Sequence, residues 1–365
     1  MRDRIQTTVR FPESLYHEFA DRVADLGENM NAVLQRLAAE WLDNLDRGSE
    51  HHVGRKDASL PSRTQLLKDF VRCLPAACAI KIQGRVVFAN PEFRRLVGGG
   101  NDLIGALPID YWPDQDAARQ IMACDRIAQD RAVPILCADH LHVRNPGPRT
   151  QDRLTIRFPI FDRAQERVEA VGVVGFDLRL LQDTAQSLEA GQCQIFEADH
   201  SGNLLEGIAI SDSLLIAFID SLPGIATVKA PDSHLLTVNR QYTILTGKSP
   251  REVLGHRPIE NWPNEIGALI ERHDREVIAR KASVMSVESI PTKHRGIQER
   301  MNMRFPIFDG KKASSNPTGI GTIGFDFGVI KKGMDLLNGP GGALHVYVFL
   351  APEKPSSLKA LSVHG

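Results

Sequence analysis

The chain has 365 residues, of which 42% are hydrophobic and 24% are charged, and its formal net charge is −1 at pH 7. That length suits two or three domains with buried cores, and the near-neutral charge excludes a uniformly basic chain that coats nucleic acid. Five cysteines without a C-x-x-C pair indicate a reducing compartment. No apolar run approaches the roughly 20 residues of a membrane span, and the first residues lack the apolar core of a signal peptide. We therefore expect a cytoplasmic protein with no membrane partner.

Residues 5–45 have the pattern of one strand followed by two helices. Apolar and polar residues alternate from Ile5 to Phe11, which is the period of a strand with one buried face. Pro12 suits the first position of a helix, and Gly27 suits a helix C-cap. Asn29 is a favourable N-cap for the second helix, which carries an apolar stripe.

A strand of this length is not stable alone, and an antiparallel ribbon made by two chains would stabilise it. The apolar side of the ribbon would close a shared core, and its polar side would enter the DNA major groove, which admits a two-stranded ribbon. Gln6, Thr8 and Arg10 are on that polar side and suit base edges: Gln suits adenine, Arg suits guanine and Thr suits either. Asn29 and Asn31, at the start of the second helix, are placed to offer backbone N–H groups to phosphate.

Residues 6–42 resemble the ribbon-helix-helix repressors of the Arc and Mnt type, and the match to Arc needs no gap. The resemblance implies a homodimer on double-stranded DNA, with base readers and phosphate-side residues at the five positions just named. Where Arc buries a charged triad, this chain has Glu28, Val33 and Leu37, which the fold tolerates. Residues 1–47 hold six Arg and nine Asp or Glu, a net charge of −3. We therefore expect modest and strongly salt-dependent DNA affinity.

An internal repeat occupies most of the remaining chain. Its landmarks recur in the same order at an offset of 147 to 150 residues, including RFPIFD at 157–162 and 304–309 and GFD at 175–177 and 324–326. Each copy has short strands first, helices in the middle and paired strands at the end, which indicates an α+β domain with an antiparallel sheet. The period is too long for a solenoid repeat, so we expect two tandem homologous domains.

The second copy resembles the PAS pattern between Thr237 and Gly255, with a strand that ends in Asn239, a short helix, a Thr-Gly pair and a Ser-Pro-Arg-Glu cap. The first copy keeps the equivalent Asn90 but has Gly98-Gly99-Gly100 in place of the second copy's Thr-Gly-Lys. The resemblance implies two PAS-like domains, each a curved antiparallel sheet with helices across one face and room for a small molecule or cofactor. Many such domains bind none and serve in dimerisation, and the fold does not decide between these roles.

The resemblance to PAS domains implies a role for three further residues. Asp177 and Asp326 match the acidic residue at the end of the last strand, which leads into the output linker and relays the signal. His273 lies on an expected helix and resembles the iron ligand of haem PAS domains. The alternative to an iron ligand is that His273 is a surface or half-buried helical histidine among charged residues. The cofactor therefore stays unassigned, and haem in the second copy is one candidate.

Two other sets of residues are less specific. Cys124, Cys137, His140 and His142 lack a standard zinc spacing, so we expect structural roles and no metal site. Trp112 and Trp262 occur in matched Trp-Pro pairs and either pack the domain or line a pocket.

No phosphate loop, kinase signature or nucleophile elbow occurs, so we expect no enzyme. The sequence predicts a one-component transcription regulator that binds operator DNA as a dimer and senses a small molecule, cofactor state or partner. The alternative is a PAS-based signalling scaffold whose N-terminal unit only dimerises it; an antitoxin is a narrower rival for that unit. The predicted boundaries are 1–46 for the ribbon-helix-helix, 47–62 for a linker, 63–182 and 213–330 for the PAS-like domains, 183–212 for a connector and 331–365 for a tail.

Overall fold

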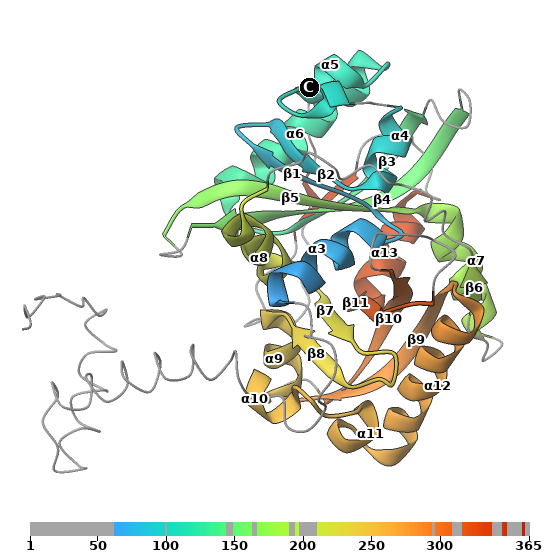
Figure 1. The fold of residues 1–365 in the computed structure, drawn as a ribbon. Helices are drawn as coiled ribbons and strands as arrows, with labels where there is room; N and C mark the ends of the chain where they lie inside the picture. The colour runs from blue at the N-terminus through green and yellow to red at the C-terminus, as the bar shows by residue number, and fades with distance from the viewer. Residues whose placement is uncertain are drawn as a thin grey trace, which may run out of the picture. The chain divides into compact units, whose positions relative to one another are not determined.

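Two antiparallel sheets, with helices between and around them, make up the part of the chain that the computed structural model describes (Figure 1). The chain divides into two units, residues 1–60 and 61–365. The described residues are 62–98, 101–143, 149–162, 166–189, 194–196, 210–293, 296–308, 316–337, 345–348 and 360–361. They confirm the α+β class with antiparallel sheets. The predicted ribbon-helix-helix lies outside them.

The first repeat contributes most of a seven-stranded sheet in the order β13-β12-β3-β4-β5-β1-β2. Its elements are α3 (Arg63–Cys73), β1 (Ala77–Ile82), β2 (Arg85–Ala89), α4 (Pro91–Val97), the short η1 (Asn101–Leu103), α5 (Pro108–Tyr111), α6 (Gln115–Arg131), β3 (Ile135–Val143), β4 (Arg149–Phe161), β5 (Val168–Asp177), α7 (Leu178–Glu189) and β6 (Gln194–Phe196).

The second repeat contributes most of a six-stranded sheet in the order β6-β9-β10-β11-β7-β8. Its elements are α8 (Asp212–Ser221), β7 (Ile225–Lys229), β8 (Leu235–Val238), α9 (Arg240–Thr246), α10 (Pro250–Val253), α11 (Pro258–Asn261), α12 (Asn264–Arg280), β9 (Ser283–Thr292), β10 (Gly296–Ile307), β11 (Gly319–Asp326), α13 (Phe327–Leu337), β12 (His345–Val348) and β13 (Ala360–Leu361). None of the described helices is long and apolar enough to cross a membrane.

The same buried asparagine organises the start of each repeat. The Asn90 side chain accepts hydrogen bonds from the backbone N–H groups of Cys78 and Phe93, and its amide donates to the carbonyls of Val71, Leu74 and Ala76. Asn239 makes the equivalent bonds around α9, with Ala226, Tyr242, Ile219 and Gly224. In each repeat this asparagine therefore caps the following helix and gives hydrogen-bond partners to backbone groups of the preceding turn. This double role explains why both repeats have asparagine at this position.

The first helix of each repeat packs on the sheet of the other repeat. Helix α3 contacts β10 of the second sheet, and α8 contacts β4 of the first. Phe70 of α3 packs against Phe305 with ring centroids 5.2 Å apart, and Phe218 of α8 packs against Phe158 at 5.3 Å. Figure 1 shows α3, α7, α8 and α13 between the two sheets, and one hydrophobic core includes residues from both repeats. The inner face of each sheet is therefore covered in part by a helix of the other repeat.

The segment that follows each repeat also crosses to the other one. After α7, strand β6 pairs with β9 at the edge of the second sheet; after α13, strand β12 pairs with β3 of the first sheet. The tail thus supplies two strands to the first sheet, β12 and the edge strand β13. Each repeat thus places its first helix and the strand that follows its last helix on the sheet of the other repeat. The two repeats are therefore related by approximate symmetry within one chain.

We expect Phe218→Ala to destabilise the chain by about 3–5 kcal/mol, because a fully buried ring that joins the two repeats is lost. Urea denaturation followed by circular dichroism gives the free energy of unfolding. Ile297→Ala is the control, since Ile297 is 75% exposed and its truncation should change stability by less than about 0.5 kcal/mol. Equal effects of the two substitutions would contradict the packing of α8 on the first sheet.

Candidate ligand-binding site

A cluster of charged side chains is buried between the sheet and α6 in the first repeat. Asp125 of α6 accepts from Lys81 Nζ of β1 at 2.7 Å and from Arg157 Nε of β4 at 3.1 Å. Arg157 Nη2 also donates to Asp139 of β3 at 3.4 Å. These four residues are at most 5% exposed. Burial without compensation would be costly for each charge, so the ion pairs are what keep the charges in place.

The local sequence explains why these side chains meet. Arg153, Thr155 and Arg157 alternate along β4 and therefore lie on one face of the sheet. Asp125 belongs to the buried stripe of α6, together with Ile121, Cys124 and Ala128. That stripe packs over the same face, so the carboxylate of Asp125 is brought to the arginine.

The second repeat contains the same cluster with one longer acid. Lys229 of β7 donates to both carboxylate oxygens of Asp274 of α12 at 2.7 Å. Arg304 of β10 lies 3.4 Å from Asp274 and 2.8 Å from Glu288 of β9. Glu288 occupies the position of Asp139, because the offset between the repeats is 149 residues there.

Glu288 is the centre of a dense polar network. Its carboxylate accepts from Ser286 Oγ at 3.0 Å, from Asn302 Nδ2 at 2.9 Å and from Arg304 Nη2 at 2.9 Å, and it lies 3.0 Å from His273 Nδ1. Burial raises the pKa of Glu288, but the Arg304 guanidinium and the hydrogen bonds from His273 and Arg304 outweigh burial and hold this pKa well below its usual range. Glu288 is therefore ionised at neutral pH.

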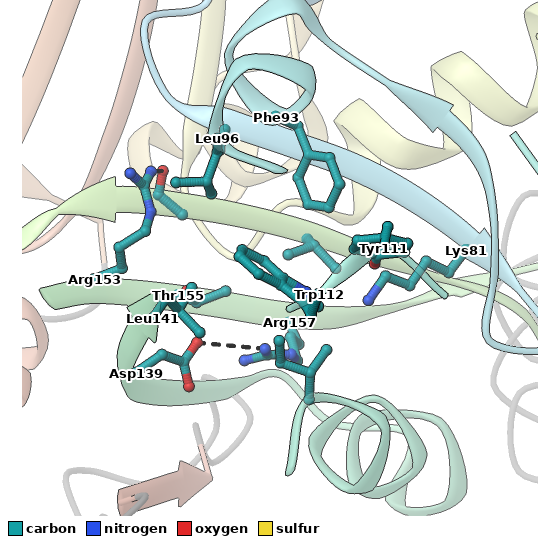
Figure 2. Close-up of a pocket in the computed structure, with 14 residues that line it drawn as sticks. Lys81, Phe93, Leu96, Tyr111, Trp112, Asp139, Leu141, Arg153, Thr155 and Arg157 are labelled. Atoms are coloured by element: carbon teal, nitrogen blue, oxygen red, sulfur yellow. Dashed lines mark hydrogen bonds and ion pairs between the residues drawn. The ribbon is translucent and has the colours of Figure 1, made fainter. Parts of the chain in front are cut away.

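In the first repeat the equivalent position opens into a pocket of about 30 Å³ (Figure 2). Its walls are mainly aromatic and aliphatic, and four charged side chains reach it. The lining residues are Ala77, Lys81, Phe93, Leu96, Tyr111, Trp112, Ile121, Asp139, Leu141, Arg153, Thr155, Arg157, Val173 and Gly175. A volume of this size holds one or two waters or the polar end of a small molecule.

Two hydrogen-bonding atoms of this pocket are buried without a well-aligned partner among the described residues: Arg157 Nη1 and the Tyr111 hydroxyl. Burial raises the pKa of the Tyr111 phenol, against the opposing effect of the nearby Lys81 ammonium. Arg153 is partnered, since its Nη2 donates to the Gly175 carbonyl at 2.6 Å. Buried donors of this kind stabilise a ligand that supplies the missing acceptors.

Comparison with known proteins agrees with the architecture. Residues 71–181 and 219–312 match the PAS fold, and the two ranges together span more than half of the chain. The chain belongs to the PAS family. The two repeats are its first and second PAS domains, as the sequence predicted.

Solved structures similar to this chain include a phage VqmA–DPO complex, with 24% identity over 34% of this chain and 56% of that chain and a TM-score of 0.29. They also include Vibrio cholera VqmA with ligand and DNA, with 20% identity, 33% and 55% coverage and a TM-score of 0.29. The PAS domain of the RpfR quorum-sensing receptor of Cronobacter turicensis with BDSF has 14% identity, 30% and 97% coverage and a TM-score of 0.24. This chain covers about half of the VqmA chains. Among curated proteins, none matches it.

The residues predicted to bind DNA, Gln6, Thr8, Arg10, Asn29 and Asn31, lie outside the described residues, and their roles stay predictions. Asp177 and Asp326 end the last strand of their PAS domains. Asp177 accepts from the N–H of Arg179 at 2.9 Å and Asp326 from that of Val329 at 3.2 Å, so each begins the helix that follows. Their role in signal relay stays a prediction.

His273 is 5% exposed and belongs to the Glu288 network. Ser286, Asn302 and Arg304 bond to that same carboxylate beside it, and such polar, close-packed surroundings do not fit a haem, which needs a wide apolar slot.

Cys124 and Cys137 are buried free thiols. No group of metal-binding side chains is found among the residues that the structure describes.

The sequence analysis noted that Trp112 packs the domain or lines a pocket. It missed the charged residues of the site, which are Lys81, Asp125, Asp139, Arg153 and Arg157. The signal was available in part, because Arg157 opens the repeated RFPIFD string and Asp125 aligns with Asp274. A charged residue that recurs inside an otherwise apolar strand indicates a buried ion pair.

We expect Glu288→Gln to destabilise the protein by about 3–5 kcal/mol at neutral pH, because it leaves buried cations without their anion. A carboxylate whose pKa is lowered by folding contributes stability above its unfolded pKa, and this contribution is lost as the pH falls. The difference between wild type and variant should therefore shrink as the pH falls below about 4, near the unfolded pKa of Glu.

Urea denaturation at a series of pH values measures this difference. Glu299→Gln is the control, because Glu299 is an exposed residue of β10. A Glu288→Gln effect that does not change with pH would contradict the ion pairing.

Proposed function

We propose that the first PAS domain is the ligand-binding sensor of a one-component, cytoplasmic transcription regulator. The observation that carries the proposal is the pocket between Lys81, Tyr111, Asp139 and Arg157, in which buried donors lack partners. A binding function rather than an enzymatic one suits a pocket whose charged groups are mostly held in ion pairs. The second PAS domain, with its network around Glu288, acts as the fixed partner on which the first is packed.

The output of the sensor is proposed to be DNA binding by residues 1–46. Its support is the alternation from Ile5 to Phe11 and the resemblance to ribbon-helix-helix repressors. Two chains would share the ribbon as a homodimer and bind a two-fold-symmetric duplex through Gln6, Thr8 and Arg10, with Asn29 and Asn31 at phosphates. Ligand binding would change operator affinity through a coupling free energy of about 1–3 kcal/mol.

The test uses the full chain, with duplexes selected from a random-sequence pool. Arg10→Ala should weaken binding to a selected duplex by about 1–3 kcal/mol and relax preference at one base position. Arg36→Ala is the matched control, since it removes the same charge from the second predicted helix. Binding should fall steeply with salt concentration. A chain without salt-dependent duplex binding is instead the signalling scaffold, dimerised by its N-terminal unit.

A further inference from the structure

The second PAS domain shows which chemical group fits the part of the cluster that both domains share. There the carboxylate of Glu288 bonds to Arg304, Asn302 and Ser286 and lies within hydrogen-bonding distance of His273. The carboxylate is delivered from β9, the strand equivalent to β3. The guanidinium of Arg304, on β10, is retained in the first domain as that of Arg157, on β4.

The first PAS domain keeps the guanidinium but shortens the acid. Asp139 is one methylene shorter than Glu288 and reaches Arg157 at only 3.4 Å, against 2.8 Å for the Glu288–Arg304 pair. Cys124 and Cys137 replace His273 and Ser286, which removes two strong polar groups. Arg157 Nη1 is left without a partner among the described residues, and the pocket opens beside it.

We infer that the ligand of the first PAS domain is a short-chain carboxylate, whose carboxylate group takes the place that Glu288 fills in the second. This inference rests on the proposed sensor role of the pocket. Three of the four charged side chains that line the pocket are cations: Lys81, Arg153 and Arg157. Paired guanidinium and carboxylate groups form strong charge-assisted hydrogen bonds, and the Tyr111 hydroxyl supplies a further donor.

The remaining lining sets the size and shape of the ligand. Phe93, Trp112 and Ile121 provide apolar walls for a short hydrocarbon body. The cavity volume of about 30 Å³ is far below the roughly 150 Å³ cavity that accommodates benzene, so the cavity holds the carboxylate end of a short aliphatic acid and excludes an aromatic one.

The experiment measures binding of acetate, propionate and pyruvate to the full chain by calorimetry and by thermal shift, with propionamide as the neutral isostere of propionate. Propionate should bind at one site per chain and raise the melting temperature, and propionamide should bind at least about tenfold more weakly, because it lacks the charge that the guanidinium bonds to. Equal binding of the amide would overturn the carboxylate class and leave the sensor proposal standing.

Asp139→Glu is the decisive variant, because it gives the first domain the acid that the second already has. It should raise the melting temperature of the ligand-free chain and weaken propionate binding by about tenfold or more. Asp116→Glu is the matched control, since Asp116 lies on the exposed side of α6 with 82% of its side chain accessible. If Asp139→Glu binds propionate with unchanged affinity, then propionate binds elsewhere and the inference is overturned.

Tyr111→Phe keeps the shape of the pocket and removes only the hydroxyl, so it tests the same site if Asp139→Glu folds poorly. It should weaken propionate binding by about tenfold. If none of the three acids binds to the wild-type chain, the carboxylate inference is wrong, and the duplex-binding assay still decides the proposed regulator role.

Discussion

A buried arginine needs acceptors, and this need organises both PAS domains. Arg157 and Arg304 are each 2% exposed in the middle of a long strand, where an unpaired charge would be unfavourable by several kcal/mol. Each is paired with an aspartate from the long helix that covers the sheet, Asp125 or Asp274. The ion pair therefore fixes the helix on the sheet, and the position of the helix in turn defines the space between them.

Within this common framework, side-chain length decides whether the space is filled. Glu288 reaches the centre of the second domain and bonds to Ser286, Asn302 and Arg304, whereas Asp139 stops one methylene short and leaves a pocket. Duplication of a domain allows such a division, because one copy can fill this position with its own carboxylate while the other leaves room for a ligand. Arg157 Nη1 and the Tyr111 hydroxyl line this pocket without a hydrogen-bond partner among the described residues, and this is the physical reason to associate the first domain with binding.

The fold was more predictable from the sequence than the site. The repeat, the α+β class and the importance of Asn90 and Asn239 follow from local patterns and from spacing, which the sequence displays directly. The pocket depends on Asp125, Asp139 and Arg157, which come from three elements far apart in the chain and meet only after folding. The exchange of helices and edge strands between the domains was missed for the same reason: periodicity shows which face is apolar but not which partner covers it.

Strand β12 gives the pocket a physical connection to the segment that follows the second PAS domain. Strand β3 carries Asp139 in the pocket wall, and its preceding residues, Ile135 to Ala138, pair with β12. Helix α13, which leads to β12, packs on β3 and β4 and also on β10 of the second domain. A change in the position of β3 on ligand binding would therefore reach both domains at once, since close-packed elements shift together rather than deform independently. The pairing of two PAS domains in one chain thus provides what a coupling mechanism requires, namely an interface on which a small displacement in one sensor acts on the whole unit.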